Sequence, residues 1–156
     1  MGLSRGHRGA DSIPFEVTTI GGTFNAMHIG HRRYIEIAFG VAHWVYIHLT
    51  SDELARAIKP YRVKHFAERQ KQIEQFLEEA GWRHRAEIRV LQSDHQLRAF
   101  CLTTDLSIAV VEPAYLDQFK GMNEARRALG SEEYCILVKP RTRTGDDDDL
   151  SSRALN

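Results

Sequence analysis

The stretch TIGGTFNAMHIGH, residues 19–31, concentrates residue types that can bind a phosphate group. Gly21 and Gly22 follow a short β-branched segment, and glycines there are expected to permit positive φ and a close approach of the backbone to an anion. His28 and His31 are three residues apart, a spacing that places two side chains on one face of a helical turn. Free backbone N–H groups and the helix dipole favour an anion at such a helix start.

The histidine pair leaves three interpretations open. A zinc site needs a third and a fourth ligand, and no cysteine or second histidine pair stands nearby at a suitable spacing. The two histidines can also be ordinary polar residues at the start of a helix. The favoured interpretation is that both act as hydrogen-bond donors to a phosphoryl group, with Gly30 leaving room beside the first helical turn.

Strand and helix patterns alternate about five times around this stretch. The predicted fold is therefore a Rossmann-like α/β domain, with a five-stranded parallel sheet between two helical layers (a three-layer α/β/α arrangement). In such a fold, ligands bind beyond the carboxyl ends of the strands. The predicted strands are 15–20, 44–49, 87–91, 107–111 and 134–138. The predicted helices are 28–40, 53–58, 66–80, 94–103 and 115–129.

The chain divides into three segments on composition. Residues 1–13 are polar and glycine-rich and are expected to form a flexible leader. Residues 14–140 carry the alternating pattern and are expected to form the folded domain. Residues 141–156 form a polar tail that includes the acidic run at 146–149, which is typical of a solvated charged segment.

Composition excludes several classes of protein. The 156 residues carry 21 basic and 21 acidic side chains, and 16 of the basic ones are arginine, the side chain best suited to grip phosphate. No basic face is concentrated enough to predict binding to a nucleic acid. No apolar run approaches the roughly 18 to 20 residues of a membrane span. Two cysteines, Cys101 and Cys135, indicate reduced thiols and a cytoplasmic protein.

The string GGTFNAMHIGH resembles the G-G-T-F-[DN]-x-x-H-x-G-H signature of the HxGH (cytidylyltransferase-like) nucleotidyltransferase superfamily. Downstream, LTSDE at 49–53 is followed by Lys59 and Arg69, with MNEAR at 122–126 and LSSR at 150–153. These segments are similar to the archaeal and eukaryotic type of phosphopantetheine adenylyltransferase. The likeness runs from about residue 15 to residue 153.

This resemblance implies transfer of AMP from ATP to 4′-phosphopantetheine, which yields dephospho-coenzyme A and pyrophosphate. The catalytic residues it implies are His28, His31 and Lys59. The nucleotide-binding residues it implies are Gly21, Gly22, Thr23, Phe24, Gly30, His31, Asn123, Arg126, Ser151 and Ser152. The acceptor-binding residues it implies are Thr23, Lys59 and Arg69.

The implied partners are ATP and a phosphorylated small-molecule acceptor, without nucleic acid or membrane, and a homo-oligomer stays open. Mg²⁺ is expected only as the ion that accompanies ATP, and no metal site of the protein's own is predicted. Two alternatives remain at this point. One is a related adenylyl- or cytidylyltransferase with another phosphorylated acceptor, and the other is a non-catalytic nucleotide-binding module.

Overall fold

The structure, a computed structural model, describes residues 12–140. The predicted tail with Ser151 and Ser152, and the predicted leader up to residue 11, lie outside the described residues. The strands are β1 (Phe15–Gly22), β2 (Ala42–Thr50), β3 (Ala86–Leu91), β4 (Ile108–Val111) and β5 (Cys135–Val138). The α-helices are α2 (Ile29–Val41), α3 (Asp52–Ile58), α4 (Phe66–Ala80), α5 (Asp94–Thr103) and α6 (Leu116–Ala128). Within this range no helix combines the length and the apolar character needed to cross a membrane.

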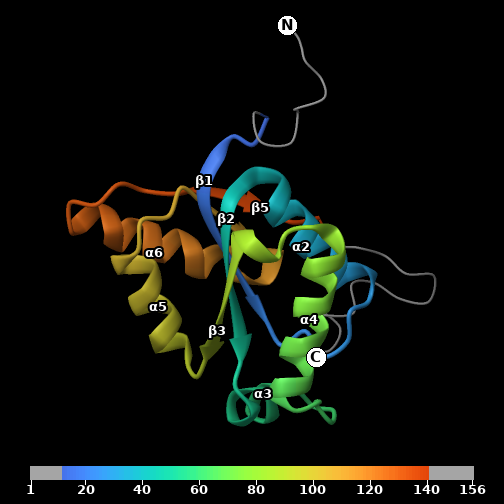
Figure 1. Cartoon of the computed structure of the whole chain (residues 1–156). Helices are drawn as coiled ribbons and strands as arrows, with labels where there is room; N and C mark the ends of the chain where they lie inside the picture. The colour runs from blue at the N-terminus through green and yellow to red at the C-terminus, as the bar shows by residue number, and fades with distance from the viewer. Residues whose placement is uncertain (1–11, 141–156) are drawn as a thin grey trace, which may run out of the picture.

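The five strands form one parallel sheet in the order β3-β2-β1-β4-β5, which confirms the predicted fold class. Helices α2 and α4 cover one face of this sheet, and α5 and α6 cover the other (Figure 1). The carboxyl ends of β1, β2 and β3 point toward α3 at the bottom of Figure 1. Because β1 is central, the glycine turn that follows it emerges in the middle of this edge.

Each face of the sheet carries its own hydrophobic cluster. The α2/α4-face cluster contains fully buried side chains from both helices and from β2, and the α5/α6-face cluster is built mainly from α5, α6 and β4. Members of the first cluster include Ile35, Phe39, Val45, Ile47, Leu49, Ile73 and Leu77. Members of the second include Cys101, Ala109, Val111, Phe119, Met122 and Tyr134. Strands with apolar residues on both faces account for this arrangement.

The helix α2 passes directly into strand β2 at Val41–Ala42, so β2 begins two residues before the predicted strand. The side chain of Arg85 makes this junction stable. Its guanidinium donates to the carbonyl oxygens of Phe39 at 2.8 Å and Ala42 at 2.7 Å, and its Nε donates to His43 O at 3.0 Å. The bond to Phe39 satisfies a carbonyl that the end of α2 leaves without a helical partner, and the other two hold the first residues of β2.

His48 is a buried polar residue on the face of β2 that meets α5. Its side chain is 3% exposed, its ring contacts the edge of Phe100 at 4.5 Å, and its Nε2 has no hydrogen-bond partner among residues 12–140. Burial, together with the positive charge of Arg89 on β3, lowers the pKa of His48 to about 4.

The buried imidazole predicts a loss of stability in mild acid. Because the folded-state pKa lies below the ordinary value of 6.5, the unfolded chain binds more protons between pH 6.5 and 4. The free energy of unfolding should therefore fall as the pH falls through that window, by about 3 kcal/mol from this group alone. Urea unfolding of wild type and His48→Phe at pH 7 and pH 4.5 measures the difference. Equal acid losses in the two proteins would contradict the assignment.

Candidate active site

A cavity of about 510 Å³ opens at the carboxyl edge of the sheet, where the fold class predicts a ligand. The turn after β1 and the start of α2 line it. The last residue of β2, helix α3 and the segment after α3 also line it, as do the end of β3 and the residues that follow β3 and β4. Of the residues predicted from the sequence, the lining includes Gly21, Gly22, Thr23, Phe24, His28, His31 and Lys59. The structure thus brings the glycine turn, the histidine pair and the lysine together.

The turn after β1 owes its shape to Phe24 and not to positive φ at the two glycines. Phe24 is the non-glycine residue with positive φ in the described chain, at 49°. A Cβ on Gly21 would lie 3.3 Å from the carbonyl oxygen of His48, and one on Gly22 would lie 3.2 Å from the Phe24 ring. The expectation of positive φ at these glycines is therefore wrong. They instead give room to the neighbouring strand and to a ring that is 1% exposed.

His28 is the N-cap of α2 and lies just before the helix rather than inside its first turn. Its Nδ1 accepts hydrogen bonds from the backbone N–H groups of Gly30 at 3.1 Å and His31 at 3.4 Å. Because a backbone N–H can only donate, Nδ1 carries no proton, and the neutral ring holds its proton on Nε2. In this arrangement His28 is a neutral ring with an N–H donor on Nε2. Gly30 is buried and contributes its N–H to the cap, and it is absent from the cavity lining.

His31 has the opposite arrangement of protons. Its Nδ1 contacts the carbonyl oxygen of Ala26, and because a carbonyl can only accept, Nδ1 carries the proton. Its Nε2 becomes a donor only when the ring takes up a second proton. The two imidazoles stack with ring centroids 3.8 Å apart, and the His31 ring lies 5.1 Å from that of Phe24. The predicted proximity of the two histidines is confirmed.

Lys59 follows α3 and lies in the same cavity as Glu112, which follows β4. Burial lowers the pKa of Lys59, and the carboxylate of Glu112 opposes that shift. The lysine is thus a partly desolvated cation beside a carboxylate. A phosphate that enters the cavity meets this cation and the helix N-terminus of α2 together.

Arg69 lies beneath the cavity and does not line it, so its direct contact with an acceptor stays a prediction. Its side chain is fully buried, and its guanidinium is 3.1 Å from the Asp52 carboxylate. It also donates to the carbonyl oxygen of Thr23 at 3.0 Å. The guanidinium is surrounded by protein groups that accept its hydrogen bonds.

Asn123 and Arg126 are also absent from the lining of this cavity, and their nucleotide-binding role stays a prediction. Asn123 pairs with the backbone of Tyr134, donating to its carbonyl oxygen at 2.7 Å and accepting from its N–H at 2.9 Å. Arg126 is 3% exposed and donates to three backbone carbonyl oxygens. These belong to Cys101 at 2.7 Å, Thr104 at 2.9 Å and Glu132 at 2.7 Å. Asn123 fastens α6 to the segment before β5, and Arg126 fastens it both to that segment and to the end of α5.

The structure adds lining residues that the sequence did not single out. They come from several elements at the carboxyl edge, and five of the thirteen are aliphatic. They are Asn25, Ala26, Tyr34, Thr50, Leu54, Ile58, Tyr61, Leu91, Asp94, Leu97, Glu112, Tyr115 and Gln118. The ends of predicted strands give one signal for Thr50, Leu91 and Glu112. Asn25 and Ala26 lie within the motif at 19–31, and the remaining residues carry no sequence signal of their own.

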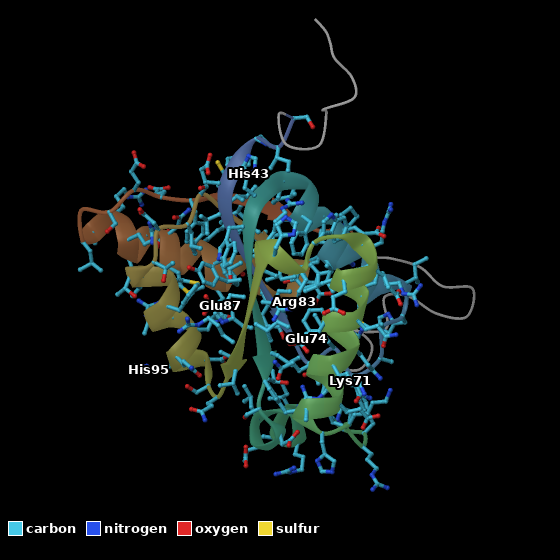
Figure 2. The ribbon with its side chains drawn as sticks, in the orientation of Figure 1. His43, Lys71, Glu74, Arg83, Glu87 and His95 are labelled. Atoms are coloured by element: carbon cyan, nitrogen blue, oxygen red, sulfur yellow. The ribbon has the colours of Figure 1, made fainter. Side chains whose placement is uncertain are left out.

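The other histidines between residues 12 and 140 do not assemble into a metal site. Figure 2 shows His43 beside the amino end of β2 and His95 on α5, well apart from each other. In the part of the chain that the structure describes, no group of three histidine, cysteine, aspartate or glutamate side chains is placed to hold a metal ion. The zinc interpretation of His28 and His31 thus gains no ligands from the fold.

Comparisons with known proteins agree with this geometry. A sequence model of the Cytidylyltransferase-like family matches residues 19–155. A phosphopantetheine adenylyltransferase of Methanopyrus kandleri is 32% identical over 146 residues, which cover 90% of this chain and 88% of that protein. One from Pyrococcus horikoshii is 33% identical over 135 residues, covering 81% and 78%.

Among solved structures, a protein of unknown function from Archaeoglobus fulgidus is similar with a TM-score of 0.68 and 27% identity. The match covers 83% of this chain and 95% of that one. These findings confirm the resemblance inferred from the motifs and the nucleotidyltransferase class that it implied. The chain belongs to the cytidylyltransferase-like family, and it is similar over most of its length to archaeal phosphopantetheine adenylyltransferases.

Proposed function

We propose that this protein transfers AMP from ATP to 4′-phosphopantetheine, forming dephospho-coenzyme A and pyrophosphate. The observation that carries the proposal is the stacked histidine pair at the N-terminus of α2, inside a cavity that also holds the glycine turn and Lys59. The similar archaeal proteins that bear the name of this activity support the choice of reaction.

The reaction asks mainly for positioning and charge stabilisation. An oxygen of the acceptor phosphate bonds to the α-phosphorus of ATP, the bond from that phosphorus to the bridging oxygen breaks, and pyrophosphate leaves. His28 donates its Nε2 proton in a hydrogen bond to the α-phosphate, and His31 donates in its doubly protonated form. Lys59 balances the negative charge that the two substrates bring together. ATP enters as its Mg²⁺ complex, with the ion on phosphate oxygens and water.

The walls of the cavity favour a long acceptor with an apolar arm. Its lining includes the large side chains of Leu54, Ile58, Tyr61, Leu97 and Tyr115. A compact polar acceptor such as glycerol 3-phosphate would leave these side chains in water. The branched arm of 4′-phosphopantetheine can cover them, which contributes roughly 25 cal/mol for each Å² of apolar surface buried. The two cysteines of the protein, Cys101 and Cys135, are expected to be reduced thiols, which supports a cytoplasmic site of action.

Pyrophosphate release measured with Mg²⁺ tests the proposal. ATP and CTP are each offered with 4′-phosphopantetheine, nicotinate mononucleotide or glycerol 3-phosphate. We expect release with ATP and 4′-phosphopantetheine and not with the other pairs. Release with another pair would keep the nucleotidyl transfer and change the substrates. If no pair released pyrophosphate while ATP still bound in a calorimetric titration, the proposed catalysis would be overturned in favour of a nucleotide-binding module.

A further inference from the structure

A chain of hydrogen bonds leads from the buried Arg69 to the surface of the cavity. Arg69 donates from its NH1 group to Thr50 Oγ1 at 3.4 Å, and Thr50 Oγ1 lies 3.0 Å from Thr23 Oγ1. Thr50 is 4% exposed and Thr23 is 5% exposed. Both threonines line the cavity, whereas the arginine does not.

The chemistry of the three groups gives this chain a direction. A guanidinium has donors and no acceptor, so Thr50 Oγ1 must accept from Arg69. Thr50 then has one hydrogen to donate, and Thr23 Oγ1 accepts it. The hydroxyl hydrogen of Thr23 is left to point into the cavity. The three hydrogen-bonded groups thus present the Thr23 hydroxyl to the cavity as a donor. A phosphate oxygen, which only accepts hydrogen bonds, needs such a donor.

The arginine at the inner end of the chain is held firmly. Its Nε donates to the carbonyl oxygen of Lys64 at 2.7 Å, and its NH2 group donates to Asp52 Oδ1 at 3.1 Å. The same carboxylate oxygen accepts the backbone N–H of Phe66, at the start of α4, at 2.8 Å. Arg69 therefore ties α4 to the start of α3 and, through the Thr23 carbonyl, to the turn after β1.

We infer that Thr50, oriented by Arg69, is a positioning residue that sets the Thr23 hydroxyl as a hydrogen-bond donor to a substrate phosphate. The inference deepens the proposed function and rests on it. Neither Thr50 nor Arg69 needs to touch the substrate. The positive charge of Arg69 reaches the cavity through two hydroxyl groups, each of which polarises the next.

A double-mutant cycle tests whether Thr50 acts through Thr23. Thr50→Val has nearly the same shape but has no hydroxyl to accept a hydrogen bond from Arg69 or to donate one to Thr23. We expect it to lower kcat/KM about fivefold. Thr23→Val removes the donor itself, with an expected loss of about 30-fold. If Thr50 acts through Thr23, the double variant should lose no more than Thr23→Val alone. Fivefold further loss in the double variant would overturn the inference.

Two further variants separate positioning from packing. Thr50→Ser keeps the hydroxyl and should recover kcat/KM to within about twofold of wild type. If Thr50→Ser were as impaired as Thr50→Val, the proposed role of the Thr50 hydroxyl in orienting Thr23 would be contradicted. Arg69→Lys cannot reach the same partners, and should lower kcat/KM at least as far as Thr50→Val. Normal kcat/KM in a folded Arg69→Lys protein would also overturn it.

The same variants remain informative if the wild-type enzyme fails to turn over 4′-phosphopantetheine. That failure concerns the proposed function, and the cycle is then scored on the affinity for MgATP by calorimetric titration. The expected pattern is unchanged, since the Thr50→Val loss should vanish in the Thr23→Val background. If the losses in MgATP affinity of Thr50→Val and Thr23→Val added in the double variant, the inference that Thr50 acts through Thr23 would be overturned, whatever the reaction is. Thermal unfolding of each variant checks that it is folded.

Discussion

Replacing His28 by alanine should lower kcat by about 1,000-fold, because the variant loses a donor aimed at the charge that develops on the α-phosphate. His31→Ala should have an effect of similar size, since its imidazole stacks on that of His28 at the same helix start. The measurement is steady-state pyrophosphate release at saturating MgATP and acceptor. If the doubly substituted protein kept wild-type turnover, the assignment of this site would be wrong.

His28 also caps α2, so alanine at this position removes two functions at once. The loss of an N-cap costs about 1 kcal/mol of stability. Asparagine is a good N-cap residue and lacks the Nε2 donor. His28→Asn should therefore unfold near the wild-type temperature and still show the loss in kcat. A variant with both stability and turnover restored would mean that His28 serves only the helix.

Arg126→Met should destabilise the fold by about 4 kcal/mol and leave substrate binding intact. The arginine is almost fully buried, and methionine would leave three backbone carbonyl oxygens without their charged donor. A destabilisation of that size lowers the unfolding temperature by about 12 °C in a domain of this length. Thermal unfolding checks the first half of the prediction, and the KM for ATP, measured well below the variant's transition, checks the second.

The family resemblance placed Arg126 with the nucleotide, so this variant decides between two roles. A role in nucleotide binding would raise the KM for ATP and leave the unfolding temperature nearly unchanged. Arg127, the next residue of α6, offers a matched control, because its guanidinium forms an exposed ion pair with Glu133 in the segment before β5. Arg127→Met should change stability by no more than about 1 kcal/mol.

The sequence predicted those features that depend on neighbours along the chain. The helix boundaries of α4 and α5 agree with the predicted ranges, because apolar spacing and the stop at Gly81 are local signals. The proximity of His28 and His31 follows from their spacing in the same way. The parallel sheet followed from the alternation of strand and helix, since such crossovers allow few topologies.

Interactions between distant segments could not be predicted in this way. The spacing of Asn123 and Arg126 correctly places them on one face of α6, but only the packed fold shows that this face meets α5 and Tyr134. Arg69 reads as a polar helix residue, and its burial depends on Asp52, 17 positions away. The residue with positive φ in the turn after β1 is Phe24. Its ring stacks on that of Tyr34 with the centroids 6.2 Å apart, a contact that the glycines in the sequence do not predict.

The two hydrophobic clusters divide the chain almost in sequence order. The α2/α4-face cluster takes nearly all its residues from before position 92, and the α5/α6-face cluster takes nearly all of its own from after it. The cavity draws on both halves, with Thr23 and Lys59 from the first and Asp94 and Glu112 from the second. A bound ligand therefore cross-links two units that could otherwise open separately. At 100 times its dissociation constant it adds about 2.7 kcal/mol to the free energy of unfolding. Amide hydrogens toward the carboxyl end of α6, beyond the cavity-lining Gln118, then exchange more slowly with solvent.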